Sequence, residues 1–437
     1  SIDATVLCFT LLISILTGLL FGLAPVTRTM KVDLIDSLKD GARGSEGTLR
    51  NRTRSLLVVF ESAVAVMLLI GAGLLVRSLI ELQKVDPGFD SNNVLTLNIA
   101  LPQQKYEAER EAANFFQQLE TRVASLPGVE TVGLITELPL TGQLNDISFT
   151  VEGRPPVSPD QALGTDWRRV NQNYFSTLRI PLLRGRNFTD HEVRQGDNVV
   201  IVSQSLVATA FPNEDPLGKT IITMFGFPQE IVGVVGDIRH SSLQSPPFPT
   251  MYFPNLNPRG MNMVIRTKGD PLSLVGAVRK EVQALDPDQP LAGVRKMSDW
   301  VDSSVAAPRY RTTLLTLFAA LAMILAATGI YGVMAYSVAQ RTQEIGVRMA
   351  LGARPFDMLK LVVRQGMILA LIGVVVGLAG ALALTRVMSS LLFGVTERDP
   401  VTFGVVAALL MVVAFIACFV PARRATKVDP LVALRYE

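Results

Sequence analysis

Long hydrophobic runs alternate with polar segments along this chain. About 20 apolar residues in a helix cross the hydrocarbon core of a bilayer, which is roughly 30 Å thick. One such run, Leu56 to Val76, contains a single acid, Glu61. The other runs carry no charge: Ala4 to Thr27, Thr312 to Ala339, Gly366 to Leu384 and Val401 to Val420. The pattern therefore predicts five membrane-spanning helices. The first run lacks the basic start of a secretory signal peptide and is too long for one.

The polar stretch between the second and third runs, residues 81–309, predicts a globular domain. Its pattern predicts two strand–helix–strand units on either side of a β-rich region at about residues 140–240. The first unit comprises Asn93 to Leu101, Tyr106 to Ala124 and Val129 to Leu134, and the second comprises Met261 to Arg266, Pro271 to Ala284 and Leu291 to Arg295. We therefore expect an α+β domain, similar to porter domains, with an inserted subdomain.

The basic residues of the short connecting segments predict the orientation. Segments 28–54, 340–365 and 421–437 together hold sixteen Lys and Arg residues, whereas segments 1–3 and 385–400 hold two. Cytoplasmic loops are enriched in Lys and Arg. We therefore expect the carboxy terminus to be cytoplasmic and residues 81–309 to lie outside the membrane.

The first and last hydrophobic runs form an internal repeat. A shift of 396 residues superimposes Asp3 on Asp399, Pro25 on Pro421 and the tripeptide Lys31-Val32-Asp33 on the same tripeptide at 427–429. Matching triplets in one register favour duplication over chance. This predicts that residues 1–40 end an upstream repeat and that the chain is the later part of a longer protein.

Composition supports a membrane protein and excludes several other classes. The 437 residues are 49% hydrophobic and 18% charged, whereas soluble domains carry about 25% charged residues. Such a hydrophobic chain is not intrinsically disordered. A net charge of +3 argues against nucleic-acid binding. Two Cys and two His residues leave little material for a disulfide framework or a zinc site.

The residues that carry chemistry do not form a catalytic set. Leu217 to Thr220 resembles the end of a phosphate-binding loop, but Asn213 stands where the first glycine would be. We therefore expect a loop that leads into a strand at Ile221–Ile222. His191 and His240 have no second ligand at metal-binding spacing. The sequence predicts no enzyme activity and no cofactor.

Three features of the hydrophobic runs remain. Cys8 and Cys418 lie near opposite faces of the membrane and are not expected to pair. Glu61 lies inside a predicted span, where acids are costly and often functional. Two roles are open for Glu61. It could take part in ion translocation, or it could simply face the bundle or the interface near Arg54, and we favour the second. Gly373 and Gly377 form a small-residue pair typical of close helix packing.

The segment 341–354 lies between the third and fourth runs. Its sequence, RTQEIGVRMALGAR, interleaves apolar residues with charges, which predicts a short amphipathic helix at the inner face of the membrane. Gly352 and the later Pro355 are typical of a helix end. The segment is either a docking site for a partner or an interfacial linker.

The sequence EIGVRMALGA at 344–353 closely resembles the signature of the FtsX-like permease domain. That family includes MacB-type efflux permeases, lipoprotein-releasing permeases and FtsX. The order of one span, a large outer domain and three spans is similar to the MacB-type layout, and residues 211–222 and 421–437 resemble other family segments. The resemblance implies an α-helical membrane bundle plus an extracytoplasmic MacB-like α+β domain. The implied domains are 1–40, the end of an upstream repeat; 41–80, the first helix; 81–309, the outer domain; and 310–437, the permease domain.

The resemblance also implies a function. This chain would be the permease subunit of an ABC transporter in the bacterial inner membrane, driven by a separate cytosolic ATPase. Glu344, Gly346, Arg348 and Gly352 would bind that ATPase and transmit its movement to the outer domain, for export. The implied partners are the ATPase, the upstream repeat or a second copy, a periplasmic adaptor and the lipid bilayer. The alternatives are an FtsX-like scaffold that regulates an envelope partner, or lipoprotein release. The sequence does not identify the substrate.

Overall fold

The computed structural model describes residues 7–12, 14–15, 45–154, 163–224, 226–254, 259–340, 348 and 354–425. Within them, four helices are long and apolar enough to cross a membrane: α2 (Ser45–Gln83), α9 (Ala306–Gln340), α11 (Pro355–Val387) and α12 (Pro400–Ala425). Four of the five predicted spans are thereby confirmed. The first predicted span, Ala4 to Thr27, lies largely outside the described residues.

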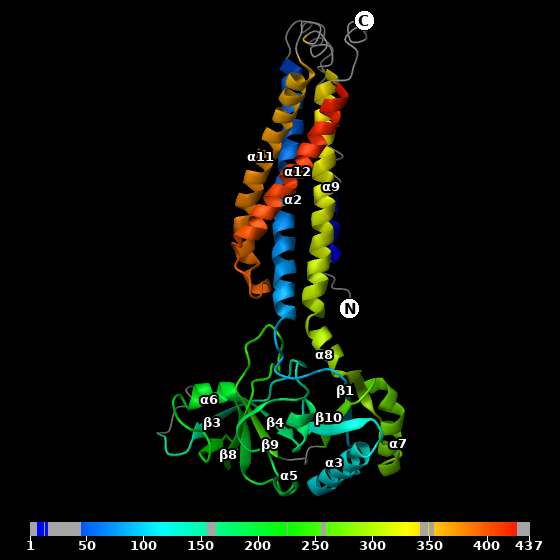
Figure 1. Ribbon diagram of the computed structural model, residues 1–437, viewed down its shortest axis with the longest axis vertical. Coiled ribbons are helices and arrows are strands. Elements are labelled where there is room, and N and C mark those ends of the chain that lie inside the picture. Colours follow the sequence, from blue (N-terminus) through cyan, green and yellow to red (C-terminus); the bar gives the residue numbers. More distant parts are fainter. Residues whose placement is uncertain are drawn as a thin grey trace. The chain divides into compact units, whose positions relative to one another are not determined.

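The chain divides into two compact units. One holds residues 1–63, 324–375 and 410–437, and the other holds residues 64–323 and 376–409. The four long helices are labelled in Figure 1, and each contributes residues to both units. In the first unit, helix packing buries a cluster made of Val58, Ile330, Met334, Ala370, Ala414, Ala417 and Cys418.

The second unit contains an α/β domain that interleaves two strand–helix–strand units (Figure 1). The strand order at one end of its sheet is β11–β1–β10–β2, and each neighbouring pair is antiparallel. The two strands of each unit are therefore separated by a strand of the other, the split βαβ arrangement. The elements are β1 (Val94–Ala100), α3 (Glu109–Ala124), β2 (Val129–Ile135), β10 (Gly260–Thr267), η2 (Pro271–Leu274), α7 (Val275–Leu285) and β11 (Ala292–Lys296). The predicted units are confirmed, with α3 starting three residues later than expected.

The β-rich region between the two units extends the same sheet. Strand β4 joins the two parts, because it pairs with β2 through Val170 and Ile135, with β3 in antiparallel and with β9 in parallel orientation. The elements are β3 (Asp146–Val151), β4 (Leu163–Val170), α4 (Tyr174–Thr177), β5 (Leu182–Gly185), α5 (Asp190–Gln195), β6 (Val199–Ser203), α6 (Gln204–Ala210), β7 (Thr220–Thr223), β8 (Pro228–Val235) and β9 (Thr250–Pro254). The helix α8 (Met297–Ser304) follows β11.

Hydrophobic periodicity explains how α3 packs in this domain. Ala112, Phe116, Leu119 and Val123 recur at spacings of three and four residues and are all fully buried, so they form one face of the helix. They belong to the same core cluster as Leu95, Leu97 and Ile99 of β1. Each fully buried Leu, Ile or Phe contributes about 1.5–3 kcal/mol of transfer free energy.

A buried ion pair fixes β4 to the segment that precedes β3. The Arg168 Nε donates to Asp166 Oδ2 at 2.7 Å, and neither side chain is exposed to solvent. Arg168 also donates to the carbonyl oxygens of Glu137 and Gln143, and Asp166 accepts from the Asn145 amide at 2.7 Å. Burial raises the pKa of Asp166, and the charge of Arg168 opposes that shift. All these bonds lie within residues 137–168, so they fasten the segment before β3 to β4.

Candidate functional site at the ends of the long helices

The predicted ATPase-binding segment lies almost entirely outside the described residues. Of the four residues named for it, Glu344, Gly346 and Gly352 are not described, and Arg348 is exposed and helical. The segment connects α9, which ends at Gln340, to α11, which starts at Pro355. Its role remains a prediction.

The acid Glu61 faces α9 in the first unit. A Cβ atom added at Gly329 would lie 2.1 Å from Glu61 Oε2, so the carboxyl group lies directly against the backbone of α9. Glu61 Oε2 is buried and has no hydrogen-bond partner among the described residues. Arg54 does not pair with it and instead lies over the Tyr336 ring, 3.9 Å from its centroid. Glu61 therefore faces α9, and within the described residues it makes no ion pair with Arg54.

Glycines also allow close packing elsewhere in the first unit. A Cβ atom at Gly373 of α11 would lie 2.5 Å from Ser62 Cβ of α2. At Gly366 of α11 it would lie 2.3 Å from Cys418 Sγ of α12. Real Cβ atoms do not approach that closely, so larger residues would force the helices apart.

In the second unit, an ion pair joins α2 to the start of α12. The Arg77 guanidinium donates to Asp399 Oδ2, which also accepts from the Thr402 amide at 2.9 Å and from the Thr402 hydroxyl. Asp399 is thus the N-cap of α12, and Pro400 occupies the first helical position. The Thr402 hydroxyl and then the Arg77 guanidinium hold the pKa of Asp399 at about 2, below its usual 3.8.

The segment between α11 and α12 makes three further contacts. The Phe393 amide donates to the Ser78 hydroxyl of α2 at 2.8 Å. A Cβ atom at Gly394 would lie 3.2 Å from Glu81 Cβ, also on α2. The Phe393 side chain packs against the core cluster of the α/β domain, which also includes Leu82 of α2. We call Arg77, Ser78, Phe393, Asp399 and Thr402 the α2–α12 junction, because they connect α2, α12 and that core.

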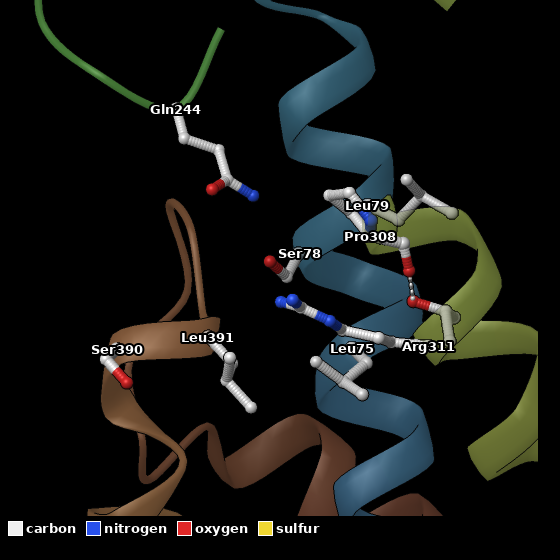
Figure 2. Close-up of a pocket in the computed structure, with 9 residues that line it drawn as sticks. Leu75, Ser78, Leu79, Gln244, Pro308, Arg311, Ser390 and Leu391 are labelled. Carbon is white, nitrogen blue, oxygen red and sulfur yellow. Dashed lines mark hydrogen bonds between the residues drawn. The ribbon is translucent and has the colours of Figure 1, made fainter. Parts of the chain in front are cut away.

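A small pocket lies beside the α2–α12 junction. Figure 2 shows the Arg311 side chain of α9 extending across it toward Ser78. Hydroxyl, amide and guanidinium groups meet leucine side chains in this pocket, so it offers both polar and apolar contacts. It is lined by Leu75, Ser78, Leu79, Gln244, Pro308, Arg311, Thr312, Ser390 and Leu391.

The other candidate residues make contacts that belong to the fold of the α/β domain or the helices. Gly218 lies in a turn with φ of +73°, the Lys219 ammonium pairs with Glu214, and β7 follows at once, which confirms the predicted loop and strand. His240 is buried with Nε2 3.0 Å from the Tyr252 hydroxyl, and burial lowers its pKa well below the usual value. The Nε2 atom of His191 lies 4.0 Å from Asp197 Oδ2.

Within the described ranges, no group of three or more His, Cys, Asp or Glu residues could hold a metal ion. Cys8 and Cys418 are free thiols.

Sequence reasoning missed the α2–α12 junction. Its two charged members are 322 residues apart, and nothing local pairs them. A partial signal was present, because Asp399-Pro400 immediately before a hydrophobic run is typical of a helix start.

Two family models match the chain. The model described as "FtsX-like permease C-terminal" matches residues 316–430. The model described as "MacB-like periplasmic core domain" matches residues 55–285, more than half of the chain. Together they cover the α/β domain except β11 and α8, and most of each of the four described long helices.

Individual relatives share only a modest sequence identity with this chain. The chain is 27% identical over 283 residues to the "Macrolide export ATP-binding/permease protein MacB" of Mannheimia succiniciproducens, covering 62% of this chain and 44% of that protein. It is 27% identical over 290 residues to the "Uncharacterized ABC transporter permease YknZ" of Bacillus subtilis, covering 61% of this chain and 69% of that protein. The match to MacB therefore spans less than half of that protein's length.

Among solved structures, the periplasmic region of MacB from Actinobacillus actinomycetemcomitans matches 51% of this chain and 97% of its own. The TM-score is 0.35 and the sequence identity is 16%.

Proposed function

Because this chain belongs to the family of ABC transporter permeases that combine a MacB-like periplasmic core domain with an FtsX-like permease domain, we propose that it couples a separate cytosolic ATPase to movement of its α/β domain. The movement serves export of a substrate that meets the domain outside the cytoplasmic membrane. In this proposal the domain is residues 81–309, the permease domain is 310–437 and the carboxy terminus is cytoplasmic. Residues 41–80 form the first helix, and residues 1–40 end an upstream repeat.

The α2–α12 junction is the observation that carries this proposal. Asp399 and Phe393 lie at the start of α12 and just before it, and they bond to Arg77 and Ser78 on α2. The Phe393 side chain packs on the core of the α/β domain. A displacement of α11 and α12 therefore shifts both the end of α2 and the domain. This supports a mechanism in which force travels along the helices and no substrate passes between them.

The force enters at residues 341–354 in this proposal. Glu344 and Arg348 make ion pairs with the ATPase, and Gly346 and Gly352 allow its surface to approach the backbone. The upstream repeat or a second copy of the permease completes the bundle, and a periplasmic adaptor contacts the α/β domain.

Co-purification of the ATPase with the full-length permease tests the proposal. We expect Glu344→Arg and Arg348→Glu to abolish ATPase association while membrane insertion is unchanged. Lys84→Glu, a matched charge reversal just after the carboxy-terminal end of α2, leaves association intact. Association that survives both reversals in the 341–354 segment contradicts the proposal. An envelope partner recovered in place of an ATPase favours the regulatory scaffold.

A further inference from the structure

Helix α2 carries three buried polar atoms that have no hydrogen-bond partner among the described residues. They are Arg54 Nη1, Glu61 Oε2 and Ser62 Oγ. All three lie in the first unit, within residues 54–62 of α2. Buried polar atoms without partners are rare in proteins, and each one calls for a physical explanation.

The position of Glu61 is set by Gly329. Because a Cβ atom there would lie 2.1 Å from Glu61 Oε2, only glycine leaves room for the carboxyl group at this place on α9. Glu61 is five residues beyond Leu56, where the apolar run begins, or about 7–8 Å along the helix. The contact therefore lies inside the apolar run, near its first end.

The charged and titratable groups on the packed helices do not neutralise this acid. Arg54 lies over the Tyr336 ring, and Arg424 of α12 donates to the Tyr331 hydroxyl of α9 at 3.4 Å. No hydrogen bond or ion pair within the described part of the chain includes Glu61. Among the residues whose side chains the structure describes, the other groups of this kind in the first unit are Cys8, Arg348, Arg354, Asp357, Lys360, Arg364, Cys418 and Arg423.

Glu61 is half-buried in the protein, with Oε2 fully buried, and an ionised carboxylate in a membrane-spanning helix is costly. Burial of an unpaired charge costs several kcal/mol, and side chains avoid it by taking up a proton. A bound metal cation would avoid it too, but hard cations require about six oxygen ligands. The neighbouring Ser62 side chain lies against Gly373 of α11, on a different helix from Gly329. The surroundings of Glu61 therefore fit a proton and not a metal ion.

We propose that Glu61 is a proton-binding site within the membrane bundle. The carboxyl group is neutral while it lies against Gly329, and it releases its proton when α2 and α9 move apart and water reaches it. Each opening of this contact therefore releases one proton, and each closing takes one up. The site depends only on the contact between α2 and α9, so it stands whether or not an ATPase drives the chain.

Infrared spectroscopy of the full-length protein at pH 7 tests the proposal. We expect a carbonyl band of a protonated carboxyl group that is lost in Glu61→Gln. The band persists in Glu81→Gln, a matched control on the same helix whose carboxylate pairs with Lys84. A spectrum that is unchanged by Glu61→Gln overturns the proposal.

Chemical labelling provides a test that needs no Glu61 variant. Dicyclohexylcarbodiimide, which reacts with protonated carboxyl groups in apolar surroundings, should modify Glu61 of the wild-type protein and leave Glu81 unmodified. Gly329→Ala displaces the carboxyl group and should reduce the labelling of Glu61, whereas Gly332→Ala, with no atom within 4 Å of the added Cβ, should not. Absence of label on Glu61, or equal labelling in both alanine variants, overturns the proposal.

Discussion

Asp399 offers the sharpest test of the α2–α12 junction, because its two roles can be separated by substitution. Asp399→Ala removes both the N-cap of α12 and the ion pair with Arg77. Asp399→Asn keeps a side-chain oxygen that accepts from the Thr402 amide and removes only the charge. We therefore expect Asp399→Ala to destabilise the protein more than Asp399→Asn does.

The magnitude follows from the pKa of Asp399. A value of about 2 in place of 3.8 corresponds to at most about 2.5 kcal/mol, at about 1.4 kcal/mol per unit. The Arg77 side chain is 46% exposed, so solvent screening reduces the ion pair to about 0.2–1 kcal/mol. Loss of an N-cap costs about 0.5–2 kcal/mol. We expect a loss of about 1–2 kcal/mol for Asp399→Ala and less than about 1 kcal/mol for Asp399→Asn.

Thermal unfolding of the full-length protein in detergent measures these differences. Because folding lowers the pKa of Asp399, its contribution is present above about pH 4 and is lost as the pH falls through about 2. The difference between wild type and Asp399→Asn should therefore shrink over that range. Glu397→Gln, two residues before Asp399, is the control and should stay within about 0.5 kcal/mol of wild type. Equal losses for both Asp399 variants would refute the capping role, and no loss in either would refute the junction itself.

Three further predictions concern the α/β domain and the bundle. Burial raises the pKa of Glu120 to about 6, so its carboxylate disfavours folding increasingly as the pH rises from about 4.5 to 6 and fully above that. Glu120→Gln keeps the oxygen that accepts from two Asn side chains and should stabilise the protein at pH 7.5 by about 1–2 kcal/mol, measured by thermal unfolding; destabilisation would contradict this. Asp166→Ala leaves the Arg168 charge buried and unpaired and should cost about 3–5 kcal/mol in the same assay, whereas a loss below about 1 kcal/mol would show that the pair is solvated. Gly373→Ala brings a Cβ atom to 2.5 Å from Ser62 and should cost about 1–3 kcal/mol, while Gly332→Ala should be neutral or stabilising by up to about 1 kcal/mol; equal effects would contradict the close packing.

Local patterns in the sequence predicted the elements of this fold well. The four long helices follow from apolar runs with at most one charge, and β1, β2, β10 and α3 follow from alternating and helical periodicity. The interleaving of the two strand–helix–strand units did not follow. It depends on pairings such as Asn98 with Asn262, whose distance along the chain leaves no trace in a local pattern.

Side-chain contacts between residues far apart in the chain, or buried by such residues, could also not be predicted from the sequence. Asp166 and Arg168 alternate with other residues along β4, a pattern typical of a strand with a solvent-facing side. Both side chains are nevertheless fully buried, and they bond to Glu137, Gln143 and Asn145 in the segment before β3. Similarly, Glu61 was recognisable as an acid in a membrane helix, but its contact with Gly329 requires the arrangement of two helices.

The proposed coupling requires residues 341–354 and the α/β domain to lie on opposite sides of one membrane. Single cysteines at Thr342 and at Ser303 of α8, introduced with Cys8 and Cys418 replaced by serine and alanine, can be probed in intact spheroplasts with a thiol reagent that does not cross membranes. We predict that Ser303→Cys is labelled at once and that Thr342→Cys is labelled only after permeabilisation. Labelling of both positions in intact spheroplasts would contradict the proposed coupling.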